Sequence, residues 1–275
     1  MNPTESTPTL EEQVAILKQQ LQQAQKLTAL GELVSTTTHE FNNVLMSILN
    51  YAKMGLRHKD EPTRDKALDK IYQAAQRAAR LTNSVLGMAR NRTPTFEATN
   101  LKVIVEESMF LLEREMTKYR IAVEMTLSDV PEIPAIGNQI QQVLLNLLIN
   151  ARQAMPNGGR LIVKLEHDPA AGVVDLIVRD NGCGIPADKL RRIFEPFFTT
   201  KNGPDETGKG GTGLGLAACR NIIEAHRGKI RVESTVGKGT AFTLRLPTQR
   251  KEPLAAPLTN TLTDATSPVE PTPQA

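Results

Sequence analysis

Residues 208–216 read Gly-Lys-Gly-Gly-Thr-Gly-Leu-Gly-Leu, and the apolar segment AACRNIIEAH follows them directly. We expect this following segment to form a helix. A glycine-rich loop that opens a helix presents backbone N–H groups to a phosphate. The stretch therefore predicts an anion site where a loop enters a helix, and the Gly, Pro and charge-rich residues 203–211 before it could form a lid over a bound nucleotide.

The glycines of the chain are unevenly distributed around this loop. Of the 18 glycines, 15 lie between Gly137 and Gly239, and only Gly31, Gly55 and Gly87 precede them. A glycine-poor half is thus followed by a glycine-rich half, which excludes one uniform fold along the chain. The length of 275 residues fits two domains at roughly 150 residues per domain.

The glycine-poor half has the apolar spacing of two long helices. Apolar residues from about Leu10 to Arg57 follow a heptad-like pattern that begins at Val14 and Leu17, which is typical of a coiled coil. A second amphipathic stretch begins near Pro62 and ends near Arg92. We expect an antiparallel helical hairpin, and because one hairpin buries little surface, two copies should pair into a four-helix bundle.

The second half alternates helical and strand patterns. Helices are expected over about 101–118 and 138–155, and the strand-like runs are RIAVEMTL, RLIVKLEH, VVDLIVRD, KIRVES and TAFTLRLP. Residues 159–167 and 172–180 alternate well enough to be neighbouring antiparallel strands. The fold class is therefore α+β, with the hairpin followed by an α/β sandwich.

These patterns divide the chain into five segments. They are a coiled-coil-like helix over 1–24, the hairpin over 25–93, a linker over 94–100, the sandwich over 101–248, and a tail over 249–275. The tail is dominated by Pro, Thr, Ser and Ala, a composition typical of disordered segments.

Composition limits the kind of partner and compartment. The net charge of +3 and the absence of Trp argue against a nucleic-acid binder. No apolar run approaches the roughly 20 residues that span a bilayer, and no signal peptide is visible, so we expect a cytoplasmic protein without membrane insertion. Two cysteines, Cys183 and Cys219, do not make a disulfide framework.

Two asparagines stand out in the helix expected over 138–155. Asn146 and Asn150 are four residues apart and share one helix face. Amide oxygens are suitable ligands for Mg²⁺. A pair of hydrogen-bonded core asparagines would show the same pattern, and for this segment alone that structural interpretation is the favoured one.

A turn-like segment, Asp180-Asn-Gly182-Cys-Gly184-Ile-Pro186, comes directly after a strand. Its carboxylate can accept a hydrogen bond from an exocyclic amine, which would select adenine, and its glycines allow close backbone approach. A plain strand-to-helix turn is the alternative interpretation. Next comes Ile193-Phe-Glu-Pro-Phe-Phe-Thr-Thr-Lys201, which holds three of the seven phenylalanines and suggests an anchored start to a mobile segment.

Taken in order, the four segments resemble the N box, first glycine box, F box and second glycine box of the GHKL ATPase superfamily. FEPFFTTK and GTGLGL together resemble the catalytic domain of sensor histidine kinases. The resemblance covers roughly residues 25–248 and implies a GHKL, or Bergerat, sandwich that binds ATP and Mg²⁺. It implies that Asn150, with Asn146, holds Mg²⁺ against the phosphates, that Asp180 contacts adenine, and that Lys201 adds a phosphate contact. The implied nucleotide-binding positions are Asn146, Asn150, Asp180, Gly182, Gly184, Lys201, Gly211, Thr212, Gly213, Leu214, Gly215 and Leu216.

The hairpin carries a segment that resembles the H box of these kinases, STTTHEFNN over residues 35–43. The resemblance implies that His39 accepts the phosphoryl group, that Glu40 orients the ring or takes its proton, and that Asn43 positions water for dephosphorylating a regulator. The best-known form of the box has proline five residues after the histidine. Here Val44 stands in that place, as in the HEFNN-type subgroup, which favours a straighter helix.

The favoured hypothesis is therefore a homodimeric histidine kinase of two-component signal transduction. It would autophosphorylate His39 and pass the phosphoryl group to an aspartate in the receiver domain of a separate response regulator. A separate sensory protein, acting on the N-terminal coil, is a further hypothesis. Two alternatives stay open: an ATP-hydrolysing conformational machine of another GHKL branch, and a coiled-coil scaffold with a degenerate nucleotide fold.

The other three histidines are not expected to be phosphoacceptors. His58 lies in the hairpin turn and His167 at a strand end, and both are expected to be solvated. His226 follows the last long helix, where the helix dipole favours a cation.

Overall fold

The computed structural model describes residues 9, 13, 38, 41–58, 60–89, 95–199 and 213–249, with side chains for all of these except 83–89. Several predicted features lie outside this range. They are most of the N-terminal coil and of the tail, together with His39, Glu40, Lys201, Gly211 and Thr212. No helix in the described ranges is both long enough and apolar enough to cross a membrane.

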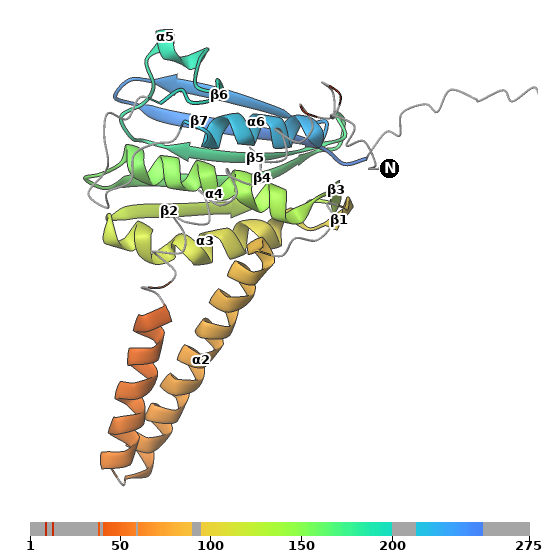
Figure 1. Cartoon of the computed structure of the whole chain (residues 1–275). Coiled ribbons are helices and arrows are strands. Elements are labelled where there is room, and N and C mark those ends of the chain that lie inside the picture. The colour runs from red at the N-terminus through yellow and green to blue at the C-terminus, as the bar shows by residue number, and fades with distance from the viewer. Residues whose placement is uncertain are drawn as a thin grey trace, which may run out of the picture.

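The predicted helical hairpin is present. Residues 41–57 form one continuous helix through Val44, and α2 (Glu61–Ala89) returns beside it after a short turn (Figure 1). The Asp60 carboxylate accepts a hydrogen bond from the Thr63 backbone N–H at 3.1 Å, which caps the start of α2. Val44, Ala67, Ala74 and Leu81 are buried along the hairpin.

The second half forms a five-stranded mixed sheet in the order β2-β4-β5-β7-β6. Its strands are β2 (Ile121–Leu127), β4 (Gly159–Asp168), β5 (Val173–Asp180), β6 (Lys229–Thr235) and β7 (Gly239–Pro247). The strands β4 and β5 are antiparallel neighbours, as their alternation predicts, whereas β2 runs parallel to β4.

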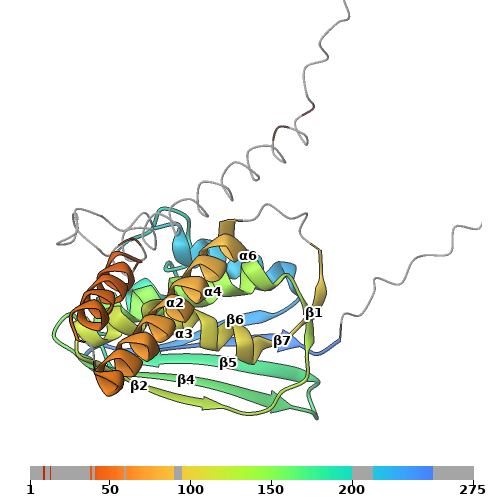
Figure 2. The same cartoon turned by 90° about the horizontal axis from the view of Figure 1, so that it is seen from below.

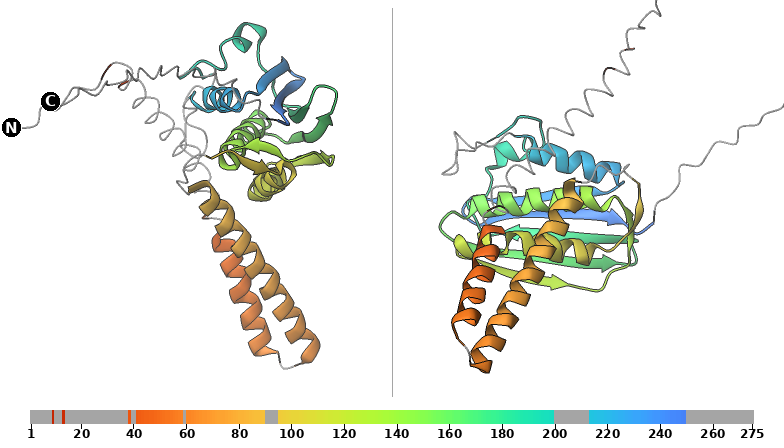
Figure 3. Two further views of the ribbon diagram at one scale, coloured as in Figure 1. Left: turned by 90° about the vertical axis from the view of Figure 1, so that its right-hand side faces the viewer. Right: turned by 60° about the horizontal axis from the view of Figure 1, so that its bottom comes forward.

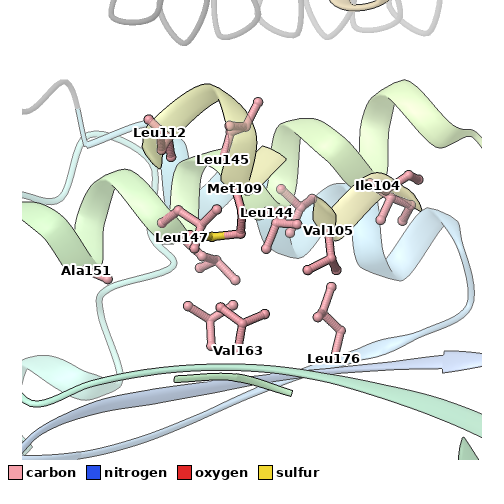
Figure 4. Packing of buried hydrophobic residues seen from close by; sticks show 14 of the residues in the cluster. Ile104, Val105, Met109, Leu112, Leu144, Leu145, Leu147, Ala151, Val163 and Leu176 are labelled. Carbon is pink, nitrogen blue, oxygen red and sulfur yellow. The ribbon is translucent and has the colours of Figure 1, made fainter. Parts of the chain in front are cut away.

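Three helices cover one face of this sheet: α3 (Leu101–Lys118), α4 (Gly137–Ala154) and α6 (Gly215–Ala225) (Figure 2). Alternate strand residues such as Val163 and Leu176 are fully buried beneath them (Figure 4). From the helices, Val105, Met109 and Leu144 fill the same layer. Period-two burial on the strands and one apolar stripe on each helix thus produce a single two-layer core, which confirms the predicted sandwich.

A small second sheet lies where the sequence pattern indicates a linker. Within 94–100, strand β1 (Glu97–Thr99) pairs antiparallel with β3 (Ile133–Ala135). Three residues are too few to show an alternating pattern, and their pairing is made by backbone groups, so the sequence does not reveal it. Directly after β1, the Asn100 side chain accepts hydrogen bonds from the N–H groups of Lys102 and Val103 and caps α3.

The hairpin projects away from the sandwich and contacts it through α2, which meets α3 and α4 (Figure 3). The guanidinium groups of Arg77 and Arg80 lie 5.3 and 4.8 Å from the centre of the Phe110 ring. Arg77 also pairs with Glu113 at 3.1 Å. Half-exposed pairs of this kind contribute little each, about 0–1 kcal/mol. The buried Ala74 and Leu81 of α2 belong to the same hydrophobic cluster as the core of the sandwich, so the contact is apolar as well as polar.

The two-layer core gives a stability prediction. Leu176→Ala on β5 should lower the free energy of unfolding by about 2–5 kcal/mol, because the cavity left beneath the helices cannot collapse. Leu56→Ala is the matched control, since Leu56 is 83% exposed, and should change stability by less than about 0.5 kcal/mol. Differential scanning calorimetry of both variants measures the difference, and equal melting temperatures would contradict the described core.

Candidate active site

The face of α4 that meets α6 carries the first predicted site residue. Asn146 is half-buried, and its Nδ2 donates to the Gly215 carbonyl oxygen at 3.4 Å and lies 3.7 Å from the Cys219 sulfur. Asn150 follows one turn later on the same face and is also half-buried. The two amides therefore lie at the junction of α4 with the helix that follows the glycine-rich loop.

Cys219 is a packing residue of this junction. Its side chain is completely buried, and its thiol donates to the Val143 carbonyl oxygen at 3.8 Å. Burial raises the pKa of the Cys219 thiol to about 12, although the hydrogen bond from Asn146 acts in the opposite direction. The thiol is therefore protonated at neutral pH. Cys183 is exposed, and neither cysteine forms a disulfide.

Asp180 ends β5 and is only 5% exposed. Its Oδ1 accepts hydrogen bonds from the backbone N–H groups of Gly182, at 2.8 Å, and Thr240, at 3.3 Å. Burial raises the pKa of Asp180, while these backbone hydrogen bonds act in the opposite direction. The carboxylate is thus fixed by one oxygen, and the other oxygen has no hydrogen-bond partner within the described part of the chain.

The turn that follows Asp180 is tied to two other elements. The Cys183 N–H donates to the Ala154 carbonyl oxygen at the end of α4, at 3.1 Å, and the Cys183 carbonyl accepts from Gly237 N–H at 2.9 Å. Gly184 has φ +71°, and a Cβ there would strike the Thr235 backbone. Only glycine fits this position, because both its backbone conformation and the neighbouring strand exclude a side chain.

The F box and the second glycine box meet at their described ends. Phe197 has φ +65°, and the backbone of Phe197 lies against Gly213, where φ is +67° and a Cβ would clash. α6 begins two residues later, and its N-cap, Leu214, provides no side-chain hydrogen bond to the first turn. An uncapped helix N-terminus offers N–H groups and a positive dipole end to an anion.

The structure thus brings together the described parts of all four segments: Asn146 and Asn150 on α4, the turn from Asp180 through Gly182 to Gly184, the end of the F box, and the residues Gly213, Leu214, Gly215 and Leu216. Motif reading missed Thr240 and Phe197. Thr240 acts through its backbone N–H, which leaves no sequence signal. The unusual backbone of Phe197 is likewise invisible without its neighbour Gly213.

The residues present fit Mg²⁺ better than a resident transition metal. Among the described residues, no three His, Cys, Asp or Glu side chains group to hold a metal ion. Asn146 directs its amide nitrogen to α6, so its amide oxygen is the atom left for a ligand role. Mg²⁺ takes oxygen donors and keeps several waters, and two amide oxygens one turn apart suit it.

Asn43 is the one predicted residue of the H box that the structure describes. It lies on the helix over 41–57 and is exposed, while its neighbour Val44 is 5% exposed and faces the hairpin core. His58 and His167 are exposed, as expected. His226 is not: it is buried, and its ring is neutral, because Nε2 accepts a hydrogen bond from Ile136 N–H.

Comparison with known proteins gives two family matches. Residues 135–250 match the family described as histidine kinase-, DNA gyrase B- and HSP90-like ATPase, and residues 29–94 match the His Kinase A (phospho-acceptor) domain. The chain is 38% identical over 248 residues to the sensor kinase CckA of Brucella abortus, covering 84% of this chain and 25% of CckA. It is 36% identical over 242 residues to the sensor histidine kinase ZraS of Escherichia coli K12, covering 86% and 50% of the two chains.

Among solved structures, the catalytic domain of the histidine kinase ThkA is 33% identical, with a TM-score of 0.49, covering 56% of this chain and 97% of that domain. The chain spans a quarter of the length of CckA and half that of ZraS. The two matched families stand in the order phosphoacceptor domain, then ATPase domain. On this basis the chain belongs to the sensor histidine kinases.

Proposed function

We propose that the chain is an ATP-dependent protein histidine kinase that autophosphorylates on His39 and transfers the phosphoryl group to an aspartate of a separate response regulator. The observation that carries the proposal is the meeting of Asn146, the Asp180 turn and the start of α6 at one end of the sandwich. Family membership and the H box motif supply the phosphoacceptor.

Asp180 would select adenine. With Oδ1 held by Gly182 and Thr240, the other oxygen is available to accept a hydrogen bond from the exocyclic amine of adenine. Guanine presents a carbonyl oxygen at the same place, which a carboxylate would repel. The site would therefore bind ATP in preference to GTP.

The phosphates would lie against the start of α6. The N–H groups of its first turn and of the preceding glycine loop would donate to phosphate oxygens, and Lys201 would add a positive charge. Asn150 and Asn146 would hold Mg²⁺, which would screen the charge on the phosphates. In phosphoryl transfer, positioning and charge stabilisation account for most of the catalysis.

His39 would act as the nucleophile. A nitrogen of its neutral imidazole attacks the γ-phosphorus, the bond to the β-phosphate oxygen breaks, and ADP leaves. Glu40 accepts the ring proton as general base. The regulator's aspartate then takes the phosphoryl group from His39. Asn43, exposed one helical turn after His39, would direct a water molecule in the reverse, phosphatase activity.

The hairpin would form the homodimer. Large apolar side chains are exposed at helical spacing on both of its helices: Phe41, Leu45, Leu49, Leu68 and Tyr72, each between 40% and 63% exposed. Stripes of this kind on paired helices are buried when a second hairpin completes a four-helix bundle.

The phosphoacceptor is tested with γ-³²P-labelled ATP. His39→Gln should abolish labelling while leaving nucleotide affinity unchanged, because Gln cannot act as the nucleophile and His39 is not among the predicted ATP contacts. His58→Gln, at an exposed position in the hairpin turn, is the control and should label as wild type. Equal acid-labile, base-stable labelling of the His39 variant would refute the assignment. Steady ATP turnover without any phosphoprotein would instead favour a hydrolysing machine.

Asp180→Asn should weaken ATP binding at least tenfold. The hydrogen bond from the adenine amine to the charged carboxylate, worth about 1.5–3 kcal/mol, would be lost, and the amide NH₂ group of Asn, itself a donor, would face the adenine amine instead. The Asn oxygen still accepts from Gly182 and Thr240, so the fold should persist. Isothermal titration calorimetry with ATP and GTP measures the affinity and the lost discrimination. Unchanged ATP affinity would remove Asp180 from the site.

The same variant has a defined pH dependence. Because burial raises the pKa of Asp180 in the folded state, its contribution to stability is greatest below the unfolded-state pKa and declines as pH rises through the folded pKa. Asp180→Asn removes this decline. The melting temperature of the variant relative to wild type should therefore rise as pH increases above about 4, the ordinary pKa of an Asp side chain. A constant difference would contradict the described burial.

Dimerisation is tested with Leu49→Glu combined with Tyr72→Glu, which places charges in both apolar stripes. We expect the Kd of the dimer to rise at least tenfold, because each charge must be desolvated in the bundle. Asn50→Glu, which adds one such charge beside the stripe rather than within it, is the control and should remain dimeric. Light scattering after size-exclusion chromatography reports the mass, and a wild-type monomer would contradict the proposal.

A further inference from the structure

His226 occupies a place in the fold that its sequence context does not suggest. It is the C-cap of α6 and only 4% exposed. Its Nδ1 lies 2.8 Å from the Ile222 carbonyl oxygen, and its Nε2 accepts from the Ile136 backbone N–H at 2.9 Å. One nitrogen must donate and the other accept, so the ring is neutral and carries its proton on Nδ1.

This ring joins three segments that are far apart in the chain. Ile222 belongs to α6, and Ile136 is the N-cap of α4, which has no side-chain cap of its own. The Phe96 ring, in the linker directly before β1, lies with its centre 5.0 Å from that of His226. The neighbouring Ala135 carbonyl accepts from the Thr99 hydroxyl at 3.0 Å, so the junction is held from both sides.

The same two helices meet again at the nucleotide end. α4 and α6 are antiparallel, because Ile136 at the start of α4 meets His226 at the end of α6, whereas Asn146 meets Gly215 at the start of α6. Ten residues along α4 and eleven along α6 separate these contacts, about 15 Å and about 16.5 Å at 1.5 Å per residue. The matching lengths mean that α6 cannot slide along α4 unless both contacts break.

We propose that His226 is a positioning residue for the nucleotide site, which holds the start of α6 in register with the asparagines of α4. Because a helix is rigid along its axis, a shift at its C-terminus moves the N–H groups at Gly215 by the same distance. Loss of the contact lowers the fraction of molecules whose phosphate site is aligned, and the apparent Kd for nucleotide rises in proportion. Because the Phe96 ring contacts His226, the position of the linker affects the same alignment of α6 with α4.

This inference rests on the proposed nucleotide site, and two substitutions isolate the contact. His226→Gln keeps an acceptor near the position of Nε2 and so keeps the bond to Ile136. His226→Asn keeps only the donor near Nδ1, leaving the Ile136 N–H unpaired. We expect His226→Asn to weaken binding of the non-hydrolysable analogue AMPPNP with Mg²⁺ about five- to tenfold, and His226→Gln to stay within about twofold of wild type.

Calorimetric titration of the full chain gives the affinity, and autophosphorylation gives KM and kcat. The KM of His226→Asn for ATP should rise by the same factor as Kd, with kcat changed less than about twofold, since His226 touches no reacting group. His167→Asn, at an exposed strand position, is the control and should match wild type. If wild type fails to bind AMPPNP, the proposed site itself is wrong.

Two outcomes would overturn the positioning role alone. One is wild-type affinity in His226→Asn, and the other is equal weakening in the Gln and Asn variants, which would mean that packing rather than the bond to Ile136 matters. If His226→Asn does not fold, Phe96→Ala decides, because it removes the ring contact but no hydrogen bond. We expect about threefold weaker AMPPNP binding from Phe96→Ala, and unchanged binding would overturn the proposal.

Discussion

The antiparallel packing of α4 on α6 is the contact on which the rest of the structure depends. At one end it is held by Asn146, Gly215 and the buried Cys219, and at the other by His226 and Ile136. α4 supplies the asparagines and α6 the N–H groups of its first turn, so in the proposed site the spacing of a metal and of phosphates would be set by how these two helices lie together. The sheet beneath them provides a flat apolar layer on which both can rest.

Around this pair the chain uses glycine where backbones must touch. Gly184 and Gly213 have positive φ, and each approaches a neighbouring backbone that leaves no room for a Cβ. The glycine asymmetry of the sequence follows from this crowding. In the described part of the hairpin, Gly55 meets only a side-chain atom, the Cβ of Ala67, and no neighbouring backbone. The hairpin's contact with the sandwich combines the half-exposed Arg77 and Phe110 and the exposed Arg80 with the buried Ala74 and Leu81 of α2.

Periodic elements could be predicted from the sequence, and isolated ones could not. The ranges of α3 and α4, the five long strands and the described parts of the hairpin helices agree with the apolar spacing, because each buries one repeated face in a common core. Strands β1 and β3 have three residues each and pair through backbone groups alone, so no side-chain pattern marks them. For His226 the sequence pointed only to the helix dipole, which favours a cation at a helix end, whereas burial and the hydrogen bond from the Ile136 N–H keep the ring neutral.

The amino-acid sequence by itself determined the fold class, the order of the two domains and the family, because these follow from local spacing and from short motifs. Tertiary structure decided which atoms of those motifs are in use. Only packing fixes one oxygen of Asp180 with Gly182 and Thr240, turns the amide nitrogen of Asn146 toward α6, and makes His226 neutral. Each of these depends on a backbone group more than 50 residues away or on burial, and neither is encoded in the neighbouring residues.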